Sequence, residues 1–190
     1  MKVIMYTANI GNYDKDIPIQ KLEYPFYRIS VSNSKNPRLL AREIKLKPHE
    51  FLPDHDYSIW IDSNFEIINP VLDFSYDIVT WKHPDRDCIY EEAKECIRLK
   101  KDDPEIIFKQ VHKYRTENYP EHNGLLASGF MIRKNTEQVN KFCEEWWDEV
   151  KHNSIRDQLS FNYVFTKYNL SLMLLNPFIG YKKYAHNNNK

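Results

Sequence analysis

Short apolar runs alternate with polar segments along the chain, and the spacing within each run predicts strands and helices in turn. Apolar, β-rich runs predict strands over residues 2–8, 25–31, 57–62, 65–68, 77–81, 128–133 and 172–175. Helical periodicity and capping signals predict helices over residues 38–47, 89–101, 104–116 and 156–168. Asn36-Pro37 supplies the N-cap and first-turn proline of the earliest helix, and Pro48 marks its end.

A longer amphipathic helix is predicted after Asn135, which we expect to be its N-cap. Its apolar side chains recur at helical spacing, at Val139, Phe142, Cys143, Trp146, Trp147 and Val150. Because the two tryptophans lie on the same stripe as the aliphatic side chains, we expect them to pack in the core rather than to bind a ligand.

The order of these elements predicts one α/β domain over residues 1–190, a sandwich with a mainly parallel sheet and a polar tail from about residue 181. In such folds, ligands collect beyond the carboxyl ends of the strands. The loop at residues 9–14 and the tripeptide Asp62-Ser63-Asn64 both follow strands in this way. We therefore expect the two segments to meet at one cleft.

Composition and charge narrow the classes of function. Of the 190 residues, 42% are hydrophobic, which is enough for one sizeable core. The 27 basic residues balance 27 acidic ones, so no overall field would attract nucleic acid or an anionic membrane. The apolar runs are shorter than the roughly 20 residues that span a bilayer, and the N-terminus has no cleavage signal, which indicates a cytoplasmic protein. Buried or unreactive thiols are expected at the cysteines, whose spacing fits no zinc or redox site: Cys88, Cys96 and Cys143.

Asp62-Ser63-Asn64 ends a buried strand and suits a divalent cation. Hard oxygen ligands two residues apart can converge on one ion, which would then bridge the two phosphates of a nucleotide diphosphate. The same tripeptide also fits a simple turn. Arg42 and Lys45 share one face of the preceding helix, where they could meet a phosphate or a site carboxylate, or form a solvated helix face.

Other polar groups near strand ends have both a functional and a structural interpretation. A cluster after the strand at 77–81 could hold a leaving diphosphate or an acidic acceptor, or form surface salt bridges; it comprises His83, Arg86, Glu91 and Glu92. Arg156-Asp157-Gln158 opens the last predicted helix, so Asp157 could simply cap it. Alternatively, Asp157 or Gln158 lies against the transferred sugar, as a base or as a group that stabilises positive charge at the anomeric carbon. His186, in the polar tail, is our candidate for a third metal ligand, although a lone histidine in such a tail commonly has no such role.

Several segments in the same order resemble one family over nearly the whole chain. They are YTANIGNYD at 6–14, LAREIKLKPHEFLPDHDYSIWIDSNFEI at 40–67, HPDRDCIYEEAKEC at 83–96, ASGFMIRKN at 127–135 and SIRDQLSFNYV at 154–164. This pattern resembles the family catalogued as domain of unknown function 616, glycosyltransferase-like proteins that include plant mucilage-related and turgor-related members.

The resemblance implies a glycosyltransferase A-type fold (GT-A), a single α/β/α sandwich with a mainly parallel mixed sheet. An Asp-x-Asp-like motif, occupied here by Asp62 and Asn64, would bind manganese or magnesium and the diphosphate of a sugar nucleotide. The loop from Thr7 to Tyr13 would hold the base and ribose, through Thr7, Ala8, Asn9, Gly11 and Tyr13. Ser128 and Gly129 would lie near the donor or acceptor, with the glycine allowing a close approach. Transferases related to glycogenin complete the metal site with a late histidine, which by analogy is His186.

The sequence thus predicts a metal-dependent glycosyltransferase. It would move a sugar from a nucleoside diphosphate, which we expect to be uridine diphosphate, to a hydroxyl group of a glycan or other acceptor. One alternative is a hydrolase that uses two carboxylates, Asp62 with Asp157 or Glu91, on a glycosidic bond. Another is a nucleotide- or glycan-binding module without catalysis. The donor sugar, the stereochemical outcome and the oligomeric state stay open.

Overall fold

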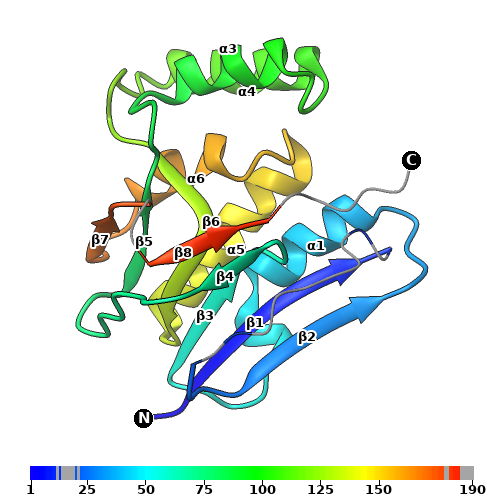
Figure 1. Cartoon of the computed structure of the whole chain (residues 1–190). Coiled ribbons are helices and arrows are strands. Elements are labelled where there is room, and N and C mark those ends of the chain that lie inside the picture. The colour runs from blue at the N-terminus through cyan, green and yellow to red at the C-terminus, as the bar shows by residue number, and fades with distance from the viewer. Residues whose placement is uncertain (12, 14–19, 21, 178–179, 185–190) are drawn as a thin grey trace.

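The computed structural model describes residues 1–11, 13, 20, 22–177 and 180–184, and Figure 1 shows their arrangement. A six-stranded sheet has the order β2-β1-β3-β6-β5-β7, and a ribbon of β4 and β8 lies against one of its faces. The strands are β1 Val3–Ile10, β2 Phe26–Val31, β3 Tyr57–Ile61, β4 Phe65–Ile67, β5 Ile78–Lys82, β6 Leu126–Lys134, β7 Leu172–Leu175 and β8 Tyr181–Lys183. The helices are α1 Pro37–Leu46, α2 Pro48–Phe51, α3 Ile89–Arg98, α4 Pro104–Thr116, α5 Glu137–His152 and α6 Gln158–Phe165.

The sheet is mixed and mainly parallel. Strand β1 is parallel to both β2 and β3, and β7 is parallel to β5. Strand β6 is antiparallel to its two neighbours, β3 and β5. The predicted fold class, an α/β domain with a mixed and mostly parallel sheet, is confirmed.

The two faces of the sheet are covered differently. On one face, Tyr6 and Ala8 of β1 belong to a core that also holds apolar side chains of α1, α5 and α6. On the other face, Val3 and Met5 pack in a second core with Phe65 and Ile67 of β4. A β-ribbon thus covers this second face, and α3 and α4 pair beyond one end of the strands (Figure 1).

Helix α1 begins as its sequence predicts. The side chain of Asn36 accepts a hydrogen bond of 3.1 Å from the backbone N–H of Leu39, and Pro37 occupies the first turn, where its missing N–H has no cost. The helix ends at Leu46. Pro48 follows this end, as predicted, and is also the first residue of the short helix α2.

The predicted N-cap of α5 is off by one residue. Thr136 caps the helix, since its hydroxyl accepts from the backbone N–H of Val139 at 3.4 Å. Asn135 uses its amide instead to donate to the carbonyl of His55 at 2.9 Å. Threonine and asparagine are both good N-caps, and the long-range bond from Asn135 to His55 leaves the capping position to Thr136.

The polar tail predicted from about residue 181 begins with a strand. Tyr181–Lys183 form β8, which pairs in antiparallel fashion with β4. The apolar ring of Tyr181 stacks on Trp81 with ring centroids 4.2 Å apart, and this contact offsets the polar composition of the segment.

The cysteine and membrane expectations can also be compared with the structure. Cys88, Cys96 and Cys143 are buried free thiols, as expected. Within the described residues, no helix is long and apolar enough to cross a membrane.

Candidate functional site

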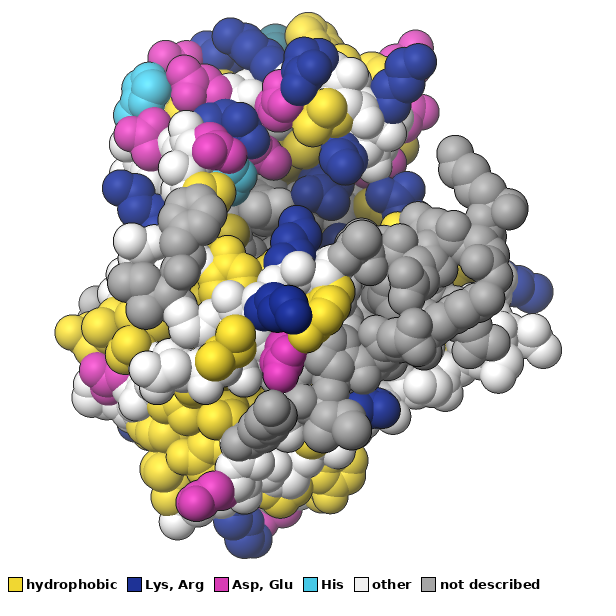
Figure 2. Space-filling model, viewed as in Figure 1, with side chains coloured by type: hydrophobic (Ala, Val, Ile, Leu, Met, Phe, Trp, Pro, Cys, Tyr) yellow, Lys and Arg dark blue, Asp and Glu magenta, His cyan; other side chains and the backbone are white. Residues whose placement is uncertain are grey.

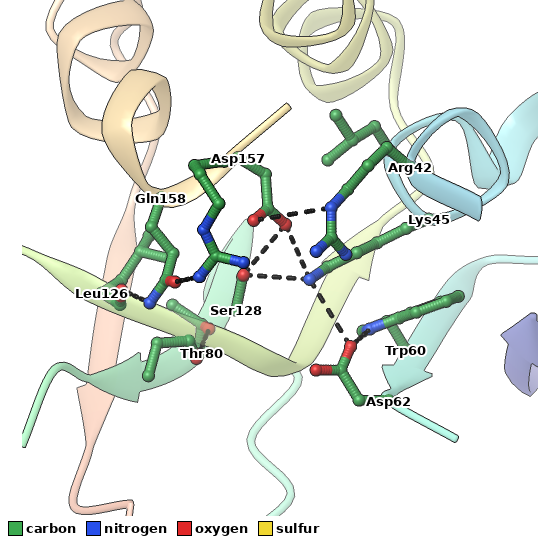
Figure 3. Close-up of polar contacts among 12 residues, drawn as sticks. Arg42, Lys45, Trp60, Asp62, Thr80, Leu126, Ser128, Asp157 and Gln158 are labelled. Carbon is green, nitrogen blue, oxygen red and sulfur yellow. Dashed lines mark hydrogen bonds and ion pairs between the residues drawn. The ribbon is translucent and has the colours of Figure 1, made fainter. Parts of the chain in front are cut away.

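The candidate site lies where β1 and β3 end at the same edge of the sheet. The two strands are parallel, with Tyr6 beside Trp60, so Asp62 emerges next to the last residues of β1. Helix α1 contributes Arg42 and Lys45 to the same place. The remaining side chains come from β6 and from the residues that open α6 (Figure 3).

Lys45 is the centre of the site. Its Nζ lies 2.7 Å from Oδ2 of Asp157 and 3.6 Å from Oδ1 of Asp62, and it donates to Oγ of Ser128 at 2.9 Å. Only 2% of the Lys45 side chain is exposed. The buried ammonium is therefore within hydrogen-bonding distance of Asp157 and Ser128, and the charge of Asp62 at 3.6 Å stabilises it further. The predicted role of Lys45 at a site carboxylate therefore matches its position.

Asp157 is a buried carboxylate held by cations. Its side chain is 1% exposed, accepts a 3.0 Å hydrogen bond from Ser128 Oγ and lies 3.9 Å from Arg42 Nε. Burial favours the neutral acid, but the charges of Arg42 and Lys45 and the hydrogen bond from Lys45 outweigh it and hold the pKa of Asp157 well below its ordinary value. Its side chain makes no capping hydrogen bond to α6.

These properties bear on the predicted catalytic role of Asp157. A general base must be able to reach the acceptor and to hold its proton near neutral pH. A carboxylate that is buried, ionised and shared between cations has neither property. The geometry therefore favours a role in positioning Lys45 and Arg42 over the role of base.

Asp62 is the more open of the two carboxylates. Its Oδ1 accepts a 2.8 Å hydrogen bond from Trp60 Nε1, and its side chain is 34% exposed. A Cβ on Gly129 would lie 3.4 Å from Asp62 Oδ2 and 3.1 Å from the ring of Trp81. Glycine at this position therefore leaves space for the Asp62 carboxylate; it is not required by an unusual backbone conformation.

The amide group of Asn64 is engaged within the protein. Asn64 is buried, and its amide donates to the backbone carbonyl of Tyr184 at 2.9 Å. His186 lies outside the described residues. Of the three predicted metal ligands, the described part of the chain thus offers a single open carboxylate oxygen, Oδ2 of Asp62, and these residues do not fit a divalent cation on their own.

Clusters of potential metal ligands occur elsewhere in the described residues. They are His49 with Glu50 and Glu144, and Asp87 with Glu91 and His122. The first already holds the ammonium of Lys47, 2.6 Å from Oε1 of Glu50. All three side chains of the second are exposed, and Glu91 therefore lies in a different group from the carboxylates of the candidate site.

Arg156 and Gln158 form a short chain of hydrogen bonds beside Asp157. Arg156 Nη2 donates to Oε1 of Gln158 at 3.0 Å, and Nε2 of Gln158 donates to the carbonyl of Leu126 at 3.0 Å. Both side chains are half-buried. The structure thus brings the predicted Arg156-Asp157-Gln158 segment to Lys45, and its assignment to the sugar stays a prediction.

The polar residues after β5 mainly hold the start of α3. His83 Nδ1 accepts from the backbone N–H of Asp85 and of Arg86, at 3.2 and 3.1 Å. Arg86 Nε donates to Oε2 of the buried Glu92 at 2.7 Å. Burial lowers the pKa of His83, against the opposing charge of Glu92. The salt-bridge interpretation of His83, Arg86 and Glu92 therefore accounts for their contacts, and contact with a substrate stays a prediction.

The predicted nucleoside-binding segment is divided by the end of β1. The strand extends to Ile10, so Thr7 and Ala8 are buried within it and Asn9 is nearly so. Gly11, with φ of +68°, opens the loop, and Tyr13 is exposed. A cavity of about 380 Å³ lies at this end of the strands, lined by Gly11, Ser32, Asn33, Ser34, Lys35 and Pro37.

A second cavity, of about 280 Å³, lies on the ribbon side of the sheet and is mostly apolar. It is lined by residues that include Ile67, Val71, Trp81, Phe130, Met173 and Leu175. It contains none of the site residues predicted from the sequence.

Arg133 and Tyr6 support the site and were not predicted. Arg133 is buried and donates to the backbone carbonyls of Lys45 at 2.6 Å and Leu46 at 3.2 Å, and also to the hydroxyl of Tyr6. The Tyr6 hydroxyl donates to the Lys45 carbonyl at 2.7 Å. These bonds satisfy carbonyls at the end of α1, where the helix leaves them unpaired, and so fix the backbone of Lys45. The one available signal was an arginine within an apolar strand run.

Asp102 is a second unpredicted support. Its Oδ2 accepts from the Ser154 hydroxyl at 2.7 Å and from the backbone N–H of Ile155 at 2.9 Å. It thereby fixes the turn that leads into Asp157. Its position between α3 and α4 gave no indication in the sequence of a contact with residues about fifty positions away.

The fold is similar to that of solved proteins. One is a glycosyltransferase involved in the glycosylation of the major capsid of PBCV-1, with a TM-score of 0.54 and 11% identity over 93% of this chain and 82% of that chain. The chain also aligns with A197 from STIV, with a TM-score of 0.44 and 14% identity over 93% of this chain and 82% of that chain. No curated protein matches the sequence. Residues 26–180 match the family described as "TOD1/MUCI70, glycosyltransferase-like domain". The chain therefore belongs to the TOD1/MUCI70 glycosyltransferase-like domain family.

Proposed function

We propose that this protein transfers a sugar from a nucleoside diphosphate, with uridine as the expected nucleoside, to a hydroxyl group of a glycan. The observation that carries this proposal is a half-buried group of three cations and two carboxylates at the carboxyl ends of β1 and β3. Its members are Arg42, Lys45, Arg156, Asp62 and Asp157. An excess of positive charge in a partly desolvated site favours an anionic ligand such as a diphosphate.

The surroundings of this group suit the other parts of a nucleotide sugar. The cavity beside Gly11 and Pro37 lies at the end of β1, the strand that pairs with β3, and can accept the nucleoside. We place the sugar between Asp62, which lies 3.6 Å from Lys45, and the half-buried Gln158, which follows Asp157. Preorganised cations that face the departing diphosphate would supply the main catalytic effect, because negative charge builds on the diphosphate as its bond to the sugar breaks.

The geometry favours a transferase over a hydrolase with two carboxylates. Such a hydrolase needs one carboxyl group that can give up a proton and another that can reach the sugar or a water molecule. Asp157 is ionised and 1% exposed, so it can serve in neither role. Glu91 lies with Asp87 and His122 in a separate exposed cluster.

A donor screen tests the proposed function. The protein is incubated with UDP-, GDP- and other nucleotide sugars, with an acceptor mixture of oligosaccharides, and both nucleoside diphosphate release and thermal shift are measured. We expect release from at least one donor. A thermal shift without release would point to the binding module, and neither shift nor release with any donor would contradict the proposal.

Variants assign the activity to this site. Asp62→Ala should lower turnover by about a hundredfold, because the proposed donor site includes its carboxylate. The protein should stay folded, because the Asp62 side chain is partly exposed. Asp54→Ala is the matched control, since Asp54 is an exposed residue before β3 that pairs with Lys2 at the opposite edge. Equal turnover of the two variants would remove Asp62 from the site.

A further inference from the structure

The charge of Asp62 is already balanced within the protein. Its Oδ1 lies 3.6 Å from the buried ammonium of Lys45 and accepts a hydrogen bond from Trp60. A divalent cation on Asp62 would lie close to this ammonium, and the two positive charges would repel each other. The buried Asn64, whose amide is bound to Tyr184, adds no charge to attract a cation.

Arg42 is the cation of the cluster that is best placed to meet a ligand. Its Nε donates to the carbonyl of Ile155 at 3.2 Å and faces Asp157, which fixes the plane of the guanidinium. No contact within the described residues involves the two terminal nitrogens of Arg42, and its side chain is 24% exposed. Figure 3 shows Arg42 and Lys45 pointing into the same space between Asp157 and Asp62. Two terminal N–H groups in one plane match the oxygens of a phosphate.

The surface around the cluster also carries positively charged side chains. The molecule is hollowed below α3 and α4, and Lys and Arg side chains gather along one side of this hollow (Figure 2). The cluster itself has three cations against two carboxylates, and the neighbouring pair of Arg86 with Glu92 is neutral and leaves this excess unchanged.

We propose that Arg42, with Lys45 behind it, neutralises the diphosphate of the donor, and that this binding needs no divalent cation. The inference rests on the proposed function and replaces the manganese ion expected from the resemblance with side chains of α1. Lys45 has two tasks in this arrangement: it compensates Asp62, and it adds positive charge beneath the phosphates. Asp157 holds both cations in place.

Binding of UDP measured by isothermal titration calorimetry tests this proposal. The wild-type protein is titrated in EDTA and again in manganese chloride, and we expect dissociation constants that agree within about twofold. Arg42→Gln should weaken UDP binding in EDTA by roughly ten- to a hundredfold, as expected for the loss of charge-assisted hydrogen bonds. Manganese should not restore it.

A control variant with the same change of charge and a double variant at the site complete the test. Lys141→Gln also removes one positive charge, but from an exposed ion pair with Glu137 near the start of α5, and it should leave UDP binding unchanged. The double variant Lys45→Met with Asp157→Asn removes both charges of the buried Lys45–Asp157 pair and leaves the partly exposed Asp62 and Arg42 without these partners. It should lose UDP binding while its thermal unfolding stays cooperative.

The outcomes separate this inference from the proposed function. Binding of UDP in manganese but not in EDTA would overturn the inference and leave the transferase intact. Binding in EDTA that Arg42→Gln does not weaken would also overturn it. Absence of UDP binding in both buffers, together with no release from any donor, would overturn both.

Discussion

Replacement of Asp157 with alanine is expected to lower the free energy of unfolding by about 3–5 kcal/mol at pH 7, the usual cost of removing one partner from a buried ion pair. The variant leaves the ammonium of Lys45 buried, with Asp62 at 3.6 Å as its remaining carboxylate, and leaves Arg42 without its carboxylate partner. The measurement is urea unfolding of the variant and the wild type, followed by circular dichroism.

The pH dependence of this difference has a definite sign. The pKa of Asp157 is lowered in the folded state, so its stabilising effect is complete above the unfolded pKa of roughly 3.9 and is lost as the pH falls further toward the folded pKa. The gap between the wild type and Asp157→Ala should therefore be constant above about pH 5 and shrink below about pH 4. A gap that is small at pH 7, or that does not change down to pH 3, would contradict the assignment of Asp157 as a buried, ion-paired carboxylate.

Replacement of Arg133 with methionine should have the next largest effect, a loss of about 2–4 kcal/mol in the free energy of unfolding. Methionine fills much of the same space, but the carbonyl of Leu46 loses its donor and that of Lys45 keeps only the Tyr6 hydroxyl. Differential scanning calorimetry would measure the change.

Arg133 should also act on ligand binding through Lys45. Because Arg133 fixes the backbone that carries Lys45, the methionine variant should bind UDP more weakly even under conditions where it is fully folded. Arg98→Met is the control, since Arg98 is exposed and pairs with its helix neighbour Glu95, and surface changes of this kind stay within about 0.5 kcal/mol. An Arg133→Met protein with wild-type stability and UDP affinity would show that the end of α1 needs no such support.

Much of the fold could be predicted because local signals and tertiary packing agree. Asn36-Pro37 caps α1 as its residue types suggest, and the apolar stripe of α5 from Val139 to Val150 is buried throughout. The errors arose where a distant partner decided the local structure. Asn135 is drawn to His55, so Thr136 caps α5 instead. Tyr181 of the ribbon stacks on Trp81 of the six-stranded sheet, so a polar segment becomes β8.

The candidate site was predictable to the same extent. Arg42 and Lys45 could be placed together because helical spacing puts residues three apart on one face, and strand ends brought Asp62 near them. Spacing alone could not show that Lys45 would pair with Asp157, which is more than a hundred positions away, or that Asn64 would turn toward Tyr184. The pattern of residue types and their structural propensities do not predict which distant residue a side chain contacts.

The position of the diphosphate in a crystal structure of the protein with UDP tests the central claim most directly. We predict phosphate oxygens within hydrogen-bonding distance of the terminal nitrogens of Arg42, with the uridine in the cavity beside Gly11 and Pro37. A nucleotide bound instead in the apolar cavity beside Trp81 and Phe130, or a diphosphate away from Arg42, would contradict it.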